Sequence, residues 1–177
     1  MEIQEAYKAK ITTQQYGKKP QIDGVEIVPL QHNIDDGGYF VELSRLADGA
    51  HTAFSTPVEV KQISLSQVIP NSVKAYHVHY KQDDVWFVAP HDKLLVNLHD
   101  IRKDSSTFDA HIRLVLGGGK ATALRIPAGV AHGVGNPYDR SMHLIYTTTE
   151  QFNISDPDEQ RLPWDHFGAE VWDLTKG

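Results

Sequence analysis

Two histidines, at positions 77 and 79, are the first side chains of this sequence whose types and spacing indicate chemistry. They lie in residues 74–84, where polar and apolar residues alternate as in a β-strand. Alternate residues of a strand point to the same face, so we expect His77 and His79 side by side, opposite Tyr76 and Val78. Two imidazoles on an inner sheet face can bind a metal ion, or one can act as a base beside a polar neighbour.

A second stretch, residues 127–136, supplies a third histidine. It reads Pro-Ala-Gly-Val-Ala-His-Gly-Val-Gly-Asn, and its Pro-x-Gly turn redirects the chain. We expect the strand after this turn to carry His132 opposite His77 and His79. For these three residues a functional role is favoured over a purely structural one, because they recur in two patterned stretches.

Short strands are expected to position these side chains. Runs typical of strands are separated by turns rich in Gly, Pro, Asp and Asn. They cover residues 25–30, 38–43, 60–69, 74–80, 85–89, 93–98, 112–116, 122–126 and 143–148. Many short strands at this spacing, without a long helical pattern, predict an all-β barrel or jelly roll.

The chain is expected to form one domain over residues 1–177. Residues 1–21 are polar and are predicted to form a loosely attached arm or an edge strand exchanged in a dimer. Residues 155–172 are acidic and aromatic, with room for a short C-terminal helical segment.

Composition excludes several classes of function. The net charge is −6 and basic residues do not cluster, which argues against nucleic acid as a partner. The absence of cysteine excludes disulfides, thiol nucleophiles and zinc–thiolate sites. Residues 1–10 are charged and lack the apolar core of a signal peptide, and no apolar run approaches membrane-spanning length. A cytoplasmic protein with no membrane partner is therefore expected.

The two histidine stretches together resemble the two motifs of the cupin superfamily of small β-barrels. His-x-His at 77 and 79 resembles the first motif, and residues 127–136 resemble the second. The likeness narrows to the RmlC-like dTDP-4-dehydrorhamnose 3,5-epimerases. Residues 100–108 look like that family's D-x-R-x-x-S-x-T-F block, and residues 126–133 look like its Ala-His-Gly turn. The likeness extends from about residue 22 to residue 172.

This resemblance implies a cupin jelly roll that forms a homodimer and works without a cofactor. It implies epimerisation of a carbon next to the ketone of a nucleotide-linked 4-keto-6-deoxy sugar. In the matching positions His77 is the base, Asp165 the carboxylate that orients it, and Tyr146 the acid that returns a proton. Four further residues are implied to line the sugar site: Lys74, His79, His132 and Glu42.

The chain departs from the family where the family has cations. The turn arginine that contacts the nucleotide is Gly37 here, and the arginine before the base is Lys74, which keeps the charge but not the bidentate fork. The lysine that helps to hold the enolate falls near Asp84 or Val85. Its loss removes an obvious stabiliser of developing negative charge.

Three alternatives remain open. His77, His79 and His132, with Asp83 or Asp84, suit iron, manganese, nickel or zinc as in metal-dependent cupins, and such a metal would replace the missing lysine. Residues 74–81 also resemble the Arg-Gly-x-His-Ala-His-Lys stretch of sugar 3,4-ketoisomerases, which shuttle protons with two histidines. A sugar-binding cupin that kept the pocket and lost the chemistry is the third.

Overall fold

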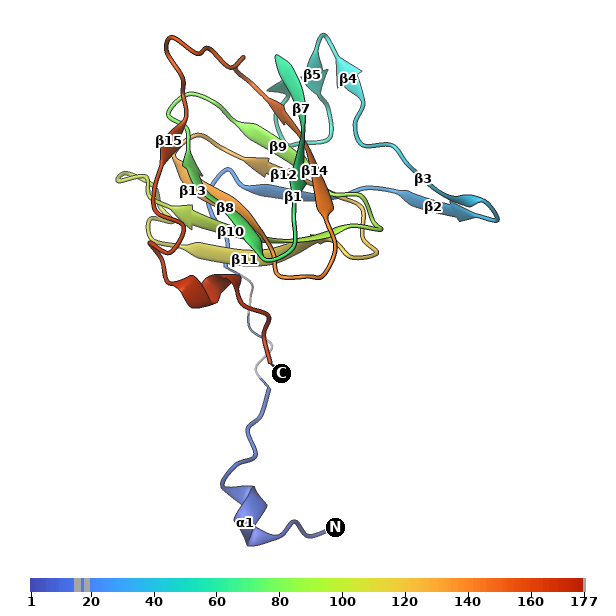
Figure 1. Ribbon diagram of the computed structural model, residues 1–177, viewed down its shortest axis with the longest axis vertical. Helices are drawn as coiled ribbons and strands as arrows, with labels where there is room; N and C mark the ends of the chain where they lie inside the picture. Colours follow the sequence, from blue (N-terminus) through green and yellow to red (C-terminus); the bar gives the residue numbers. More distant parts are fainter. Residues whose placement is uncertain (15–16, 18–19, 177) are drawn as a thin grey trace.

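Two five-stranded antiparallel sheets form the body of the protein in the computed structural model, which describes residues 1–14, 17 and 20–176 (Figure 1). The first sheet has the order β1 (Glu26–Pro29), β12 (Thr122–Ile126), β9 (Asp84–Phe87), β14 (Met142–Thr148) and β7 (Gln62–Val68). The second has the order β11 (His111–Gly117), β10 (Lys93–Asp100), β13 (Val130–Asn136), β8 (Ser72–Val78) and β15 (Gln160–Arg161). The predicted all-β architecture is confirmed.

Apolar side chains from both sheets meet in one core. Leu94, Val96 and Leu98 of β10 pack with Leu124 and Ile126 of β12, and each of the five is at most 1% exposed. The strands read as apolar runs because both of their faces contact other parts of the chain. This packing fixes the separation of the sheets, and therefore the positions of the side chains that project between them.

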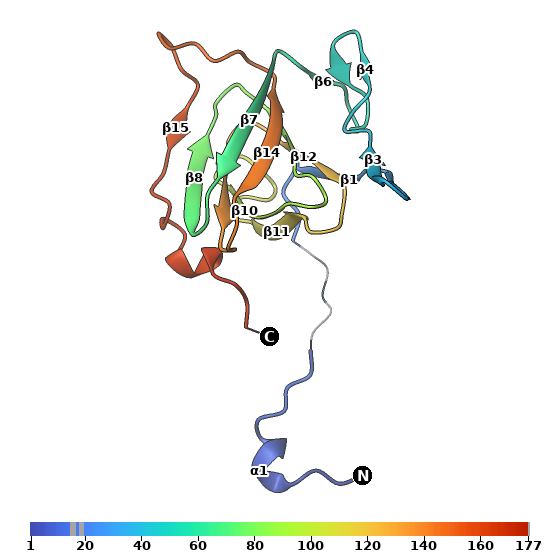
Figure 2. The same ribbon diagram turned by 45° about the vertical axis from the view of Figure 1, so that its right-hand side comes forward.

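Smaller elements extend from the two sheets (Figures 1 and 2). The hairpin of β2 (His32–Asp35) and β3 (Gly38–Val41) contains the predicted turn, and a three-stranded sheet follows it, with β4 (Leu46–Ala47), β5 (Ala50–His51) and β6 (Val58–Glu59). The C-terminal helical segment is a 3₁₀ turn, η1 (Ala169–Trp172). No helix in residues 1–14, 17 and 20–176 is long and apolar enough to cross a membrane.

The N-terminal arm lies away from the sheets (Figure 2). Residues 1–14 are exposed and include one short helix, α1 (Glu5–Lys8). Positions 15, 16, 18 and 19 of the predicted arm lie outside the described residues. Exchange of the arm between subunits stays a prediction.

The block at residues 100–108 is structural. The buried Asp100 carboxylate accepts hydrogen bonds from Arg102 (2.8 Å), Ser105 (2.5 Å) and Thr107 (2.6 Å). The Arg102 guanidinium, followed by the two hydroxyls, holds the pKa of Asp100 well below its usual range. Gly129 has φ +80°, and a Cβ there would lie 2.6 Å from Cγ of Arg102. The Pro-x-Gly turn therefore rests on this block and needs its glycine.

Acid is expected to destabilise the fold through His99 on β10. This ring is 8% exposed and stacks on Phe167 (centroids 3.6 Å apart) and on His111 (4.1 Å). Burial, and then the neighbouring His111 and His166, lower the pKa of His99 from 6.5 to about 4. Between these values the unfolded chain binds the proton first, so stability present above pH 6.5 is lost as the pH falls.

At pH 5 this one group is expected to lower the free energy of unfolding by about 2 kcal/mol. Urea unfolding at pH 7 and pH 5 measures the difference for the native chain and for His99→Phe. The variant should lose correspondingly less stability, whereas the exposed His91→Phe should behave as the native chain does. An equal acid loss in all three proteins would contradict the prediction.

Candidate active site

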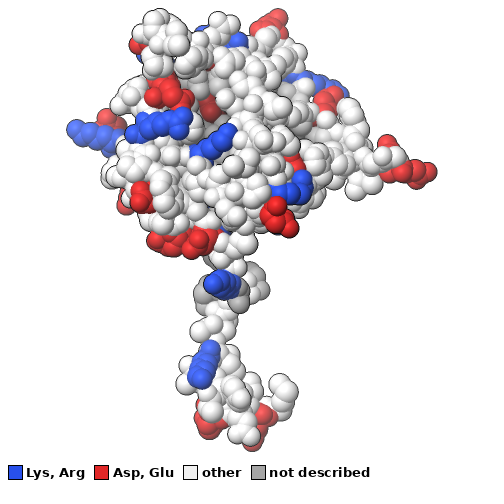
Figure 3. Space-filling model, viewed as in Figure 1, with Lys and Arg blue, Asp and Glu red and all other residues white. Residues whose placement is uncertain are grey.

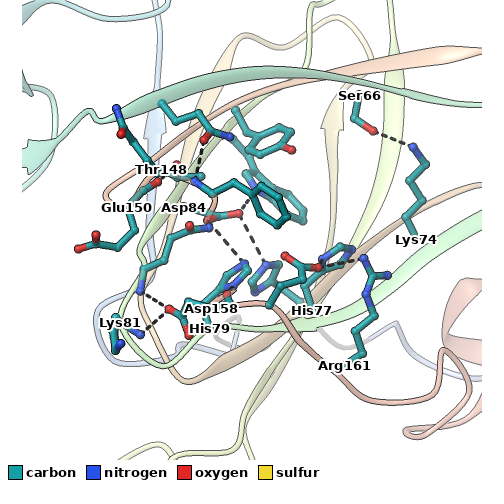
Figure 4. A pocket seen from close by; sticks show the side chains of 18 of the residues that line it. Ser66, Lys74, His77, His79, Lys81, Asp84, Thr148, Glu150, Asp158 and Arg161 are labelled. Atoms are coloured by element: carbon teal, nitrogen blue, oxygen red, sulfur yellow. Dashed lines mark hydrogen bonds and ion pairs between the residues drawn. The ribbon is translucent and has the colours of Figure 1, made fainter. Parts of the chain in front are cut away.

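An open cavity of about 670 Å³ lies between β8 on one wall and β7, β9 and β14 on the other (Figure 4). Six of the residues named from sequence line it: Lys74, His77, His79, Asp84, His132 and Tyr146. The structure therefore brings the three histidines together with the predicted acid. Glu42 and Asp165 are not among the lining residues.

His77 at the end of β8 and His79 just after it face the same way, as predicted. His77 and His79 line the cavity, whereas Tyr76 and Val78 pack on the opposite face in a cluster with Trp172. On the adjacent strand β13, His132 pairs in register with His77. The rings of His77 and His132 are stacked, with centroids 5.9 Å apart and planes 12° from parallel. The expected position of His132 is confirmed.

Glu159 is the carboxylate beside His77. Its Oε1 lies 2.5 Å from Nδ1 of His77 and 2.9 Å from a guanidinium nitrogen of Arg161. The hydrogen bond from His77 lowers the pKa of Glu159 to about 2, so this group is an anion that can only accept. Nδ1 of His77 must then carry its proton, which leaves the lone pair on Nε2 as a base.

Sequence reasoning assigned this orienting role to Asp165, which the structure does not place among the residues that line the cavity. Asp165 is exposed and lies in a turn that is closed by a 2.9 Å hydrogen bond from the amide of Gly168 to the Asp165 carbonyl. The residue that reaches His77 precedes β15, which pairs with β8 so that Arg161 lies opposite His77. Glu42, which was predicted to line the sugar site, is exposed and pairs with Arg45 at 2.7 Å.

Asp158 fixes the end of the histidine strand. Its carboxylate accepts hydrogen bonds from the backbone amides of Tyr80, Lys81 and Gln82 at 2.8, 2.8 and 3.0 Å. Its backbone carbonyl accepts a hydrogen bond from Nδ1 of His79. Residues 158–161 thus form one side of the site, and sequence reasoning missed them. The adjacent acidic pair Asp158-Glu159 was the only signal.

Tyr146 lies on the wall opposite His77. It comes from β14, where it pairs in register with Trp86 of β9, and it is half-buried. His77 comes from β8 of the other sheet. A ligand between the walls would therefore meet the imidazole on one side and the phenol on the other.

Three cations lie at the cavity: Lys74, Lys81 and Arg161. Lys74 donates to the hydroxyl of Ser66 at 2.8 Å, and Figure 4 shows this pair at one side of the site. Figure 3 shows basic side chains between the positions that β15 and β7 occupy in Figure 1, interspersed with acidic ones. Such cations suit an anionic ligand group.

Comparisons with known proteins agree on one family. A sequence model described as dTDP-4-dehydrorhamnose 3,5-epimerase matches residues 19–171. The chain is 39% identical over 144 residues to the spore coat polysaccharide biosynthesis protein SpsL of Bacillus subtilis (strain 168). This alignment covers 81% of this chain and 91% of that protein. It is 31% identical over 146 residues to a probable low-salt glycan biosynthesis epimerase, Agl13, of Haloferax volcanii. This alignment covers 82% of this chain and 90% of that protein.

The fold also matches solved structures. The dTDP-6-deoxy-D-glucose-3,5-epimerase RmlC of Legionella pneumophila, in complex with dTDP-4-keto-L-rhamnose, superimposes with a TM-score of 0.72 and 22% identity, covering 89% of this chain and 83% of that one. A dTDP sugar isomerase of Desulfovibrio desulfuricans G20 gives a TM-score of 0.71 and 23% identity, covering 90% and 94%. The expected RmlC-like cupin jelly roll is therefore confirmed.

Proposed function

The chain belongs to the dTDP-4-dehydrorhamnose 3,5-epimerase family of sugar epimerases, and we propose that it moves a proton next to the ketone of a nucleotide-linked 4-keto-6-deoxy sugar. The observation that carries this proposal is the pairing of His77 with Glu159 on one wall of the cavity and Tyr146 on the other. An epimerase needs a base on one face of the carbon and an acid on the opposite face.

The proposed reaction has two proton transfers. Nε2 of His77 removes the proton from the carbon beside the ketone. The C–H electron pair forms a C=C bond, and the carbonyl π pair moves onto oxygen to give an enolate. The Tyr146 hydroxyl then donates its proton to the same carbon from the opposite face, which restores the ketone with inverted configuration. Glu159 stabilises the imidazolium that forms on His77, through the 2.5 Å hydrogen bond at Nδ1.

The nucleotide part of the proposal is supported by charge. Lys74, Lys81 and Arg161 line the cavity, and ammonium and guanidinium groups bind phosphate oxygens well. The Legionella pneumophila relative was solved with dTDP-4-keto-L-rhamnose. A dTDP-linked 4-keto sugar is therefore the substrate class to test first.

Deuterium exchange tests the function directly. The protein is incubated in D₂O with dTDP-4-keto-L-rhamnose, and mass spectrometry and NMR follow the positions next to the ketone. We expect uptake of at least one deuteron at a rate well above that of the protein-free control. Tight binding of the sugar nucleotide without deuterium uptake would reject catalysis and indicate a binding protein.

We also propose that the protein is a homodimer that works in the cytoplasm. The cytoplasmic location stays a prediction from sequence. The dimer is supported by β7, an edge strand whose Ile63 and Leu65 side chains are each 68% exposed. Sedimentation should give twice the mass of one chain for the native protein and the single mass for the double variant Ile63→Asp, Leu65→Asp. A native monomer would reject the dimer.

A further inference from the structure

A second group of side chains in the cavity is separate from the His77–Glu159 pair. His79, Asp84 and His132 are 4%, 4% and 2% exposed. Each offers one ligand atom, and the three atoms lie within 4.8 Å of one another. Figure 4 shows His79 pointing toward Asp84. Two imidazoles and one carboxylate form a ligand set that is typical of divalent transition metals.

The hydrogen bonds of both histidines fix where their lone pairs lie. Nδ1 of His79 is bonded to the backbone carbonyl of Asp158, and Nδ1 of His132 lies 2.8 Å from the carbonyl of Val130. A carbonyl can only accept, so both Nδ1 atoms carry protons. The Nε2 lone pairs then face Asp84. Metal-binding histidines are commonly held in this way, by a carbonyl at the other ring nitrogen.

Both imidazoles lie close to the Asp84 carboxylate. Nε2 of His79 lies 3.9 Å from Oδ1 of Asp84, and Nε2 of His132 lies 3.7 Å from Oδ2. Ligand atoms about 2.1 Å from a shared metal ion would be separated by roughly 3–3.5 Å. The two histidine–carboxylate separations are therefore close to those of a metal site, and the widest separation in the group, up to 4.8 Å, would have to shorten by roughly 1–2 Å on binding.

Asp84 is held in place as metal-binding carboxylates are. Nε2 of Gln82 donates to Oδ1 at 2.7 Å, and Nε1 of Trp86 donates to Oδ2 at 2.9 Å. The Trp86 ring also contacts His132 edge to face, with centroids 5.2 Å apart. These contacts orient both oxygens of a buried carboxylate toward the two histidines, and they neutralise none of its charge.

We infer that His79, Asp84 and His132 bind one divalent first-row transition metal ion in the floor of the cavity, and that His77 is not a ligand. From sequence, His77 was either a base or a metal ligand. The geometry gives the two roles to different residues, with His77 as the base and His79, Asp84 and His132 as the ligands. The role of the ion in catalysis rests on the proposed function. There, the ion would bind the ketone oxygen and stabilise the enolate while His77 takes the proton. The substrate would supply a further ligand to the ion.

Metal binding without substrate is the test. The untagged chain of residues 1–177 is stripped with a chelator and titrated with Co²⁺, whose visible absorption reports its coordination. We expect one Co²⁺ per chain. Asp84→Asn and His79→Ala should each weaken binding by at least about 100-fold, since changes to outer-shell partners alone cost about 10–100-fold. Circular dichroism checks that each variant is folded. If Asp84→Asn does not fold, His79→Ala provides the test of metal binding.

Two histidine variants complete the test. His77→Asn should keep Co²⁺ affinity within about threefold of the native chain. His143→Asn controls for adventitious binding, because His143 lies 3.1 Å from the carboxylate of Asp92 outside the cavity. Failure of the native chain to bind Co²⁺, or equal losses in His77→Asn and Asp84→Asn, would overturn the inference. If the native chain catalyses deuterium exchange but does not bind Co²⁺, only the metal site is rejected. If it binds Co²⁺ but does not catalyse deuterium exchange, only the proposed function is rejected.

Discussion

Replacing His77 with asparagine is expected to slow deuterium exchange next to the ketone by about 10²–10⁴-fold, the contribution of one positioned general base. Asparagine can still donate a hydrogen bond to Glu159 from its side-chain NH₂, but it cannot take a proton at neutral pH. The ring of His77 is partly exposed at the cavity, so the variant is expected to fold. Exchange measured with saturating substrate isolates the chemical step from binding.

His143→Asn is the matched control, because it also removes one imidazole beside a carboxylate but lies outside the cavity. Its exchange rate should stay within about twofold of the native rate. Calorimetry measures the affinity of His77→Asn for the sugar nucleotide. This affinity should change much less than the exchange rate does. Exchange at the native rate in His77→Asn would show that another group is the base, and the assignment of His77 would be wrong.

The sequence was informative wherever a local pattern determines which way a side chain points or where the chain turns. The period of two in residues 74–84 predicts that His77 and His79 share a face, and the structure places both at the cavity. The Pro-x-Gly turn predicts that the next strand carries His132 to His77 and His79, and on β13 His132 lies in register with His77. The strand predicted over residues 122–126 coincides with β12. In each case neighbouring residues and one turn determine the outcome.

The sequence was uninformative where a contact depends on irregular chain far along the sequence. Glu159 reaches His77 from 82 residues away, out of a loop that has no period. Only two residues of β15 pair with β8, which is too short a run to predict as a strand. Asp165 matched the family's carboxylate by position, yet it lies in an exposed turn. On β7 the apolar residues Ile63 and Leu65 face outward, a choice that alternation alone does not determine.

Glu159→Gln, compared with Asp165→Asn, decides which carboxylate serves His77. A charge pair about 4 Å apart is worth about 4 kcal/mol near a protein surface. The Glu159 side chain is 32% exposed, so solvent screening reduces this value. We therefore expect Glu159→Gln to lower kcat for exchange by about 10²-fold, which corresponds to about 2.7 kcal/mol. Glutamine keeps an oxygen to accept from Nδ1, so the comparison isolates the negative charge.

The effect should fall on kcat rather than on KM, because the charge acts on the imidazolium that forms during proton removal and not on bound ground-state sugar. Arg161, which lies 2.9 Å from Glu159, strengthens the expectation. Without the carboxylate its cation would face the imidazolium and oppose proton removal. Asp165→Asn should leave kcat within about twofold, since that side chain is exposed in a turn. A larger loss in Asp165→Asn than in Glu159→Gln would mean that residues 163–168 move to His77 when substrate binds, and that the carboxylate indicated by sequence is the functional one.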